Sequence, residues 1–327
     1  MTNESSVMPK QSTPKIPIHR MILEKGKEYD LVVCAGEKGL DNCITQEELH
    51  RPGLAFAGFL DVFTYDRVQI LGNTEIEYLK SLSPAERIAR LQPIFAFPIP
   101  CFIITSANVP PREMVEMANE RSIPLLCSSI PTSAFNAMIS FWLQREFAPT
   151  ITVHAVLVDV FGVGVLITGG SGIGKSECGL ELIERGHRLV ADDSVILKRL
   201  GRNILMGSSS ATIQHHMEVR GLGIIDVELL FGIGSVREQK RVSLVVDLKR
   251  WEDAPEIDRL GIDVTYHHYL DVGIRKFELP VESGRNISIL IEVAALQHRI
   301  LERGRNPAEE LNRRVISQMM AENEMNG

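Results

Sequence analysis

Apolar and polar positions in the first half of the chain indicate short strands and helices that alternate. The apolar runs at 101–110 and 123–129 flank residues 111–122, where apolar positions recur at helical spacing. This order predicts a strand–helix–strand unit with some parallel sheet. Ser83, followed by a proline, is the predicted N-cap of a short helix. The amphipathic pattern of residues 132–149 predicts a further helix, which ends at a proline.

The second half begins with two β-rich runs in residues 150–170, and the glycines between them predict a tight hairpin. The elements predicted after it are a glycine-rich loop with a helix through Glu184, strands over 188–197 and 241–248, and helices over 287–304 and 307–324. We therefore predict an α/β protein of two domains. The predicted parts are a polar, flexible tail over residues 1–15, a small N-terminal α/β domain over 16–149, and a C-terminal domain over 150–327.

Composition narrows the class of protein. The chain is 44% hydrophobic and 24% charged, which is typical of a soluble globular protein. Its formal net charge of −7 argues against nucleic acid as a partner. No apolar run has the length of a membrane helix, and the first residues lack the apolar core of a signal peptide, so we predict a cytoplasmic protein without a membrane partner.

Five scattered cysteines form no CxxC pair, and a chain of this length needs no cross-links to fold. We therefore predict that all five are reduced thiols. They are Cys34, Cys43, Cys101, Cys127 and Cys178. Cys178, at the start of a predicted helix, is expected to be buried against the sheet.

The glycine-rich loop matches the whole P-loop pattern GxxxxGKS between a strand and a helix. In such a loop the backbone N–H groups converge on phosphate oxygens, and the helix N-terminus adds positive potential. The lysine would reach the β- and γ-phosphates of ATP, and the serine hydroxyl would ligate Mg²⁺. The nucleotide-binding residues predicted on this basis are Gly169, Gly170, Ser171, Gly172, Ile173, Gly174, Lys175 and Ser176.

Two further groups of polar residues follow the loop. Asp192 and Asp193 are expected on a strand, where neighbours point to opposite faces, so that one faces the γ-phosphate and accepts a proton from an attacking hydroxyl. Glu218 and Arg220 precede a flexible glycine pair and suit a Mg²⁺ and phosphate site. Taken alone, Asp192 and Asp193 fit a polar turn as well as a catalytic pair, and Glu218 and Arg220 fit an ordinary charged strand end with a glycine bend better than a binding site.

The motifs together resemble the HPr kinase/phosphorylase family over almost the whole chain. The motifs that carry the resemblance are HAVLVDVFGVGVLITGGSGIGKSE at 154–177, LVADDSV at 189–195, EVRGLGIIDV at 218–227, DRLG at 258–261, ELPVESGRN at 278–286 and IEVAALQHRI at 291–300. The resemblance implies a C-terminal P-loop kinase domain similar to phosphoenolpyruvate carboxykinase and assembly as a hexamer.

The resemblance also implies roles for single residues. His154 would help to position phosphate. Asp193 would exchange a proton with the substrate serine, and Asp192 would be the second candidate for this proton transfer. Arg259 corresponds to the family arginine of the DRLG motif. Ser176 and Glu218 would ligate Mg²⁺. The segment used in both directions of the reaction would be Glu218, Val219, Arg220, Gly221, Leu222 and Gly223, and the segment tied to dephosphorylation Pro280, Val281, Glu282, Ser283, Gly284 and Arg285.

The implied activity has two directions. ATP with Mg²⁺ would phosphorylate a serine of the phosphocarrier protein HPr, and inorganic phosphate would remove the phosphate as pyrophosphate. Two residues depart from the family pattern PVRPGR, because Glu282 replaces an arginine and Ser283 a proline. Glu282 brings repulsive charge to a phosphate, so phosphorolysis is the weaker of the two expectations. Two rival hypotheses are a P-loop kinase of a small molecule and a nucleotide-sensing regulatory module that transfers no phosphate.

Overall fold

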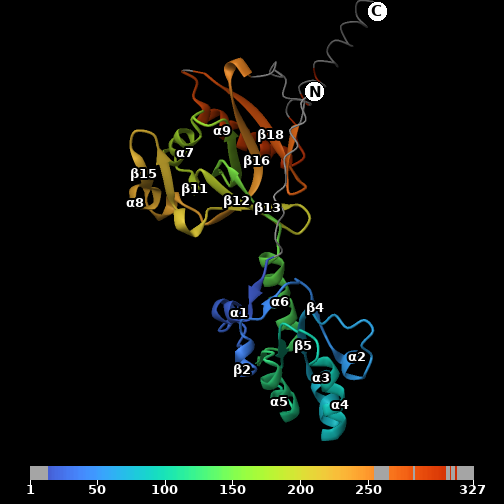
Figure 1. The fold of residues 1–327 in the computed structure, drawn as a ribbon. Coiled ribbons are helices and arrows are strands. Elements are labelled where there is room, and N and C mark those ends of the chain that lie inside the picture. The colour runs from blue at the N-terminus through green and yellow to red at the C-terminus, as the bar shows by residue number, and fades with distance from the viewer. Residues whose placement is uncertain (1–13, 254–264, 283, 307–309, 311–313, 315–327) are drawn as a thin grey trace, which may run out of the picture. The chain divides into compact units, whose positions relative to one another are not determined.

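The computed structural model describes residues 14–253, 265–282, 284–306, 310 and 314. These residues form two compact units that divide between Phe147 and Ala148. Figure 1 shows helices packed around a sheet in each unit. No helix of the described part is long and apolar enough to span a membrane.

The first unit contains a five-stranded sheet of order β2-β7-β6-β5-β4, with β4 to β7 parallel and β2 antiparallel at one edge. Its strands are β1 Ile16–Pro17, β2 Val32–Ala35, β3 Cys43–Ile44, β4 Leu49–His50, β5 Val68–Leu71, β6 Phe102–Ile104 and β7 Leu125–Cys127. Its helices are α1 Ile18–Lys25, α2 Gly53–Phe56, α3 Asn73–Ser81, α4 Pro84–Ile94, α5 Arg112–Arg121 and α6 Thr132–Glu146. Two apolar clusters, one on each face of this sheet, form its core.

Several predicted elements of the first unit are confirmed. Strands β6 and β7 are parallel neighbours joined by α5, as the strand–helix–strand pattern predicted. The side chain of Ser83 accepts a hydrogen bond from the backbone of Glu86 and so caps α4, as expected. Helix α6 matches the amphipathic pattern that predicted it.

The prediction that all five cysteines are free is wrong. The structure pairs Cys34 with Cys127 in a disulfide, with a Cα–Cα distance of 6.3 Å. The two residues are 93 positions apart in sequence, but β2 and β7 are neighbouring antiparallel strands. Sequence spacing carries no information about such a cross-strand contact. Cys178 is buried, as predicted, and burial raises the pKa of its thiol to about 11.

The second unit is formed by a nine-stranded mixed sheet in which the order β11-β9-β10-β16-β13-β12-β8 is extended by β18 and β17 beside β16. Its strands are β8 Thr150–His154, β9 Val156–Val160, β10 Val163–Gly169, β11 Arg188–Ala191, β12 Ser194–Leu200, β13 Ile204–Ser208, β16 Gln239–Arg250, β17 Thr265–Tyr269 and β18 Val272–Val281, with β14 His216–Val219 and β15 Gly223–Asp226 as a separate hairpin. Its helices are α7 Lys175–Glu184, α8 Val227–Phe231 and α9 Ile287–Glu302.

The predicted hairpin is confirmed, with Phe161 and Gly162 in left-handed conformation between the antiparallel strands β9 and β10. Strand β10 runs parallel to β16, and α7 packs on the core that these strands share with α9. The single strand predicted over 188–197 is instead two strands, β11 and β12, joined at Asp192 and Asp193. The helix predicted over 307–324 lies outside the described residues except at Glu310 and Arg314.

Candidate active site

The loop between β10 and α7 turns at glycines with left-handed backbone. The φ angles are 143° at Gly169, 74° at Gly172 and 99° at Gly174. A Cβ at Gly172 would stand 2.9 Å from the guanidinium of Arg220, and its positive φ would strain any other residue. At Gly170 the backbone is not left-handed and nothing lies within 4 Å of a Cβ position. The shape of the loop therefore depends on Gly172, whereas Gly170 has room for a side chain.

Lys175 is the first residue of α7 and is only 7% exposed. Its Nζ donates hydrogen bonds to the backbone oxygens of Gly169 and Gly170, at 3.1 and 3.2 Å. The ammonium group therefore lies against the inner side of the loop. Because backbone carbonyls are weaker partners than anionic oxygens, the same group can turn to an anion held by the loop.

Asp192 braces two elements from beneath the pocket. It is 4% exposed, and its Oδ1 accepts a hydrogen bond of 3.0 Å from the Ser176 hydroxyl. Its Oδ2 accepts one of 3.1 Å from the backbone N–H of Glu218. Burial raises the pKa of Asp192 above its ordinary range, although these hydrogen bonds act in the opposite direction. The carboxylate thus ties the start of α7 to β14.

Asp193 has the opposite environment. Its backbone is left-handed, with φ of 60°, and its side chain is 61% exposed. Its Oδ1 lies 2.8 Å from Nδ1 of His154, which also lies 3.0 Å from the Asp193 backbone oxygen. Strands β8 and β12 set this contact, because His154 pairs with Ser194 in their antiparallel ladder. The turn, rather than alternation along a strand, separates the two aspartates.

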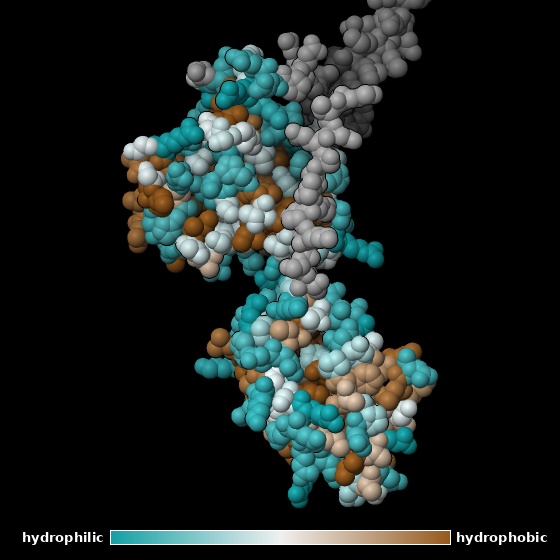
Figure 2. Space-filling model, in the orientation of Figure 1, coloured by the Kyte–Doolittle hydropathy of each residue, from teal (hydrophilic) through white to brown (hydrophobic). Residues whose placement is uncertain are grey.

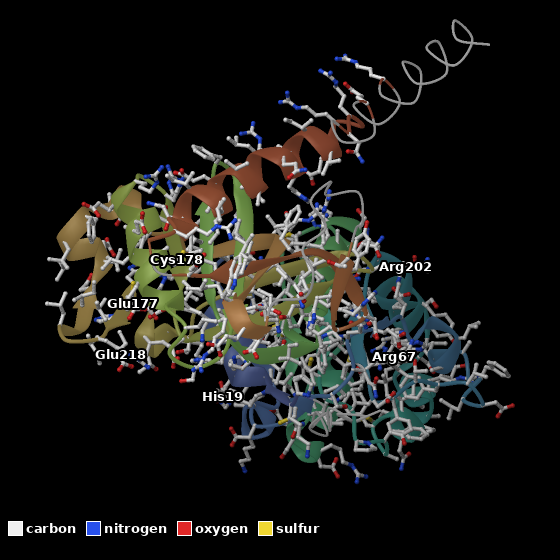
Figure 3. All side chains as sticks on the ribbon, turned by 90° about the horizontal axis from the view of Figure 1, so that it is seen from above. His19, Arg67, Glu177, Cys178, Arg202 and Glu218 are labelled. Atoms are coloured by element: carbon white, nitrogen blue, oxygen red, sulfur yellow. A yellow bond between two sulfur atoms is a disulfide. The ribbon has the colours of Figure 1, made fainter. Side chains whose placement is uncertain are left out.

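Most of these groups line one pocket of about 190 Å³. The lining residues are His154, Val156, Ser171, Gly172, Gly174, Lys175, Ser176, Glu177, Asp193, Glu218 and Arg220. The side chains come from β8, the start of β9, the loop, α7, the turn after β11 and the β14–β15 hairpin. In Figure 3, Glu177 and Glu218 lie close together although they come from α7 and β14. The pocket combines a cation beneath the loop with carboxylates around its opening.

The structure brings together most, but not all, of the predicted site residues. Gly169, Gly170 and Asp192 contact pocket residues without lining the pocket, and Ile173 packs against the core. Within the hairpin, Val219 is buried and Leu222 is exposed. The dephosphorylation segment begins with the last two residues of β18 and contributes no described residue to the pocket lining; its described residues are Pro280, Val281, Glu282, Gly284 and Arg285. Arg259 and Ser283 lie outside the described residues.

Two residues near the pocket were not predicted. Glu177 lines it from the first turn of α7, where a carboxylate suits the helix N-terminus. Asp247, which follows the apolar run within β16, pairs with Thr168 of β10 just before the loop and accepts a 3.0 Å hydrogen bond from the Thr168 hydroxyl. Burial acts to raise the pKa of Asp247, but hydrogen bonds from Lys276, Lys249 and Thr168 outweigh it and hold the pKa below its ordinary range. The sequence signal that could have predicted Asp247 is a carboxylate at the end of an apolar run.

No cluster of three or more His, Cys, Asp or Glu side chains suited to a metal ion occurs in the part of the chain that the structure describes. Any divalent ion here would therefore bind through a mixed set of oxygen ligands. Ser176 and Glu218 offer such oxygens, and Asp192 links the two residues because its carboxylate accepts hydrogen bonds from the Ser176 hydroxyl and from the Glu218 backbone N–H. Hard oxygen ligands of this kind suit Mg²⁺.

Comparison with known proteins matches both units. Residues 17–143 match the family model "HPr Serine kinase N terminus", and residues 145–315 match "HPr Serine kinase C-terminal domain". The HPr kinase/phosphorylase of Leptospira biflexa serovar Patoc is 45% identical over 296 residues, covering 90% of this chain and 92% of the relative. That of Geobacter sulfurreducens is 43% identical over 290 residues, covering 89% and 91%.

A solved structure was also found, that of the Hpr(Ser) kinase/phosphatase from Coxiella burnetii. It is 39% identical, covers 47% of this chain and 93% of its own, and has a TM-score of 0.45. The matches in sequence define the class, a two-domain α/β enzyme of the kinase type. The chain belongs to the HPr serine kinase family.

Proposed function

We propose that this protein transfers the γ-phosphoryl group of ATP to a serine of the phosphocarrier protein HPr. We also propose that it catalyses the reverse removal of that phosphate by inorganic phosphate, with release of pyrophosphate. The observation that carries the proposal is the convergence of Lys175, His154 and Asp193 on the pocket above the glycine-rich loop. A cation held beneath the loop and an exposed carboxylate beside it supply phosphate binding and proton transfer together.

The loop would act as a P-loop within a nucleotide core similar to that of phosphoenolpyruvate carboxykinase. Its left-handed glycines leave backbone N–H groups free to face phosphate oxygens, and α7 adds the positive end of its dipole. Lys175 would then exchange the carbonyls of Gly169 and Gly170 for phosphate oxygens. The same cradle would hold inorganic phosphate in the reverse direction.

Mg²⁺ would be held by Ser176 and Glu218. When bound, the ion would neutralise charge on the phosphate oxygens. Asp192 is the residue that orients this pair, because it accepts hydrogen bonds from both the Ser176 hydroxyl and the Glu218 backbone. This buried position also argues against Asp192 as the residue that meets the substrate.

Asp193 would carry the proton. In the forward direction the substrate serine oxygen forms a bond to the γ-phosphorus, the bond from that phosphorus to the β–γ bridging oxygen breaks, and Asp193 accepts the serine proton. In the reverse direction an oxygen of inorganic phosphate forms a bond to the phosphoserine phosphorus, the bond from that phosphorus to the serine oxygen breaks, and Asp193 returns a proton to the serine oxygen, as microscopic reversibility requires. His154, 2.8 Å away, would fix the orientation of the carboxylate.

A second feature favours a protein substrate over a small molecule. Six large apolar side chains, with exposed fractions between 42% and 84%, form an apolar surface on and after the β14–β15 hairpin. They are Leu222, Ile224, Leu229, Leu230, Phe231 and Ile233. Figure 2 shows hydrophobic residues gathered at the edge of the second unit where Figure 1 places β15 and α8. The same hairpin supplies Glu218 and Arg220 to the pocket, so we propose that HPr covers this surface while its serine enters the pocket.

The family resemblance further supports a hexameric assembly and a cytoplasmic location, and we propose both. Family membership also supports a role in catalysis for Arg259 and in dephosphorylation for residues 280–285. Glu282 makes phosphorolysis weaker than in relatives with an arginine there.

The experiment mixes the purified protein with HPr, Mg²⁺ and γ-labelled ATP, and then adds excess phosphate. We expect label on an HPr serine and then in pyrophosphate, with both steps lost in Lys175→Ala. Transfer by Lys175→Ala at the parent rate would refute the mechanism. In Leu229→Ser we expect a higher KM for HPr with an unchanged KM for ATP, whereas Ile204→Ser, at an exposed position on β13, serves as the matched control. Turnover of ATP with small metabolites but not with HPr would favour the small-molecule kinase.

A further inference from the structure

A second pocket lies in the C-terminal unit and shares no residue with the candidate active site. It has a volume of about 290 Å³ and lies where the first part of β16, strands β17 and β18, and the end of α9 meet. Figure 1 shows α9 beside β16 and β18. The polar side chains that line it include Arg241, Ser243, Tyr266, Arg275, His298 and Glu302.

Two buried nitrogen atoms of this pocket lack hydrogen-bond partners among the described residues. They are Nε of Arg275 and Nε2 of His298. The latter lies 3.4 Å from Oε1 of Glu302, which is an ion-pair distance without hydrogen-bond geometry. Folded proteins leave few buried polar atoms unpaired, and each such atom has room for a partner such as a water molecule, an ion or a ligand.

The charges around the pocket are also unbalanced. Arg241 and Arg275 bring two guanidinium groups, whereas Glu302 is the one carboxylate among the described lining residues, and its side chain points largely into solvent. Arg275 is held in place by stacking on Phe277, 4.9 Å from the ring centre. Burial lowers the pKa of His298. The charge of Glu302 acts to raise this pKa, and the charge of Arg275 acts to lower it further. A positive, partly desolvated cavity of this kind attracts an anion.

We propose that this pocket binds a small ligand through an oxyanion, either a phosphate or a carboxylate group. A planar guanidinium offers parallel N–H donors that match the spacing of two anionic oxygens. Nε of Arg275 would find its partner in the ligand, and the hydroxyls of Ser243 and Tyr266 would add further hydrogen bonds. The volume of about 290 Å³ has room for the oxyanion together with a small organic body.

The site would bind its ligand without transferring a group. Its described lining contains no glycine-rich loop, no lysine beneath such a loop and no exposed aspartate, which are the features that the candidate active site combines. Arg275 pairs with Leu244 of β16 and Tyr266 of β17, so ligand binding would join the three strands at this end of the sheet. The proposal stands independently of the function proposed above.

Titration calorimetry on the full-length protein tests the proposal, with inorganic phosphate and malonate as separate probes. Lys175→Ala serves as the background in which phosphate binding at the candidate active site is removed. We expect this variant to bind at least one of the two probes, and the stronger of them identifies the oxyanion. Adding Arg275→Gln should weaken that binding at least tenfold. Adding Arg202→Gln, a matched change at an exposed arginine, should leave it unchanged.

Two additional variants separate ligand contact from folding. Arg275→Lys keeps the charge but removes the paired donors, so it should also weaken binding, with an unchanged circular dichroism spectrum. Arg241→Gln removes the second guanidinium from an exposed position and should weaken binding even if Arg275→Gln does not fold. The proposal fails if the Lys175→Ala protein binds neither probe, or if the Arg241 and Arg275 variants bind as tightly as that background.

Discussion

His154 ends β8 and Asp193 immediately precedes the neighbouring strand β12, with imidazole Nδ1 2.8 Å from carboxylate Oδ1. The contact holds an exposed carboxylate at the mouth of the pocket, while the preceding residue, Asp192, is buried beneath it. Two adjacent residues of the same type thus have different surroundings. This difference assigns them different roles in the proposed reaction.

The first prediction concerns these roles. Asp193→Asn should lower kcat for phosphate transfer by roughly 10²- to 10⁴-fold, since it removes the proton acceptor, and it should leave the KM for HPr nearly unchanged. Asp192→Asn should instead raise the Mg²⁺ concentration needed for half-maximal rate, because Ser176 and Glu218 lose their common brace. Rates measured over a Mg²⁺ series distinguish the two. Equal effects of both variants at saturating Mg²⁺ would contradict the assignment.

The second prediction concerns stability and pH. The folded state raises the pKa of Asp192, so the stabilising contribution of this group is present below its unfolded pKa of about 3.9 and is lost as pH rises through the folded value. For Asp247 the folded pKa is lowered, so its contribution is present above about pH 4 and is lost as pH falls through the folded value.

The two asparagine variants should therefore diverge in opposite directions. The free energy of unfolding can be measured in urea from about pH 3 to about pH 7, a range around the ordinary aspartate pKa. As pH rises, the parent should lose stability relative to Asp192→Asn. Over the same range the parent should gain stability relative to Asp247→Asn. If both differences change with the same sign, the opposite pKa shifts are wrong.

The third prediction concerns the glycine-rich loop. Gly172→Ala places a Cβ against Arg220 on a left-handed backbone. The backbone strain amounts to about 1–2 kcal/mol, and we expect the loop to relieve it by changing its conformation. ATP binding, measured by calorimetry, should weaken strongly. Gly170→Ala in the same loop meets no neighbour and should bind ATP like the parent. Weak binding by both variants would show that the loop tolerates no side chain and would remove the basis for this distinction.

The fourth prediction concerns the departure at Glu282. Replacing it with arginine restores the residue of the family pattern and exchanges a negative charge for a positive one in the proposed dephosphorylation segment. An exposed charge pair is worth up to about 1 kcal/mol, so phosphate-dependent dephosphorylation should rise by up to about fivefold while phosphorylation changes little. Glu238→Arg, at another exposed position, controls for net charge. A rise in both directions of the reaction would show a general electrostatic effect instead.

Much of the secondary structure and the position of the loop could be predicted from sequence, because both depend on local patterns. The β9–β10 turn needs glycine for its left-handed backbone, α4 begins where Ser83 caps it, and the loop requires glycines at fixed spacing before a lysine. The resemblance to the family was likewise carried by ordered local motifs, and the family matches confirm it.

The amino-acid sequence by itself thus determined the family, the two-domain α/β architecture and the residue types available for chemistry. Only the tertiary structure decided which of two adjacent aspartates is buried, because a turn with left-handed backbone at Asp193 replaced the expected strand. It also paired Cys34 with Cys127 and gathered Arg241, Arg275 and His298 around one cavity. The disulfide and the cavity join residues that are distant in sequence. Strand order and register set the distances between such residues, and no local pattern encodes either of them.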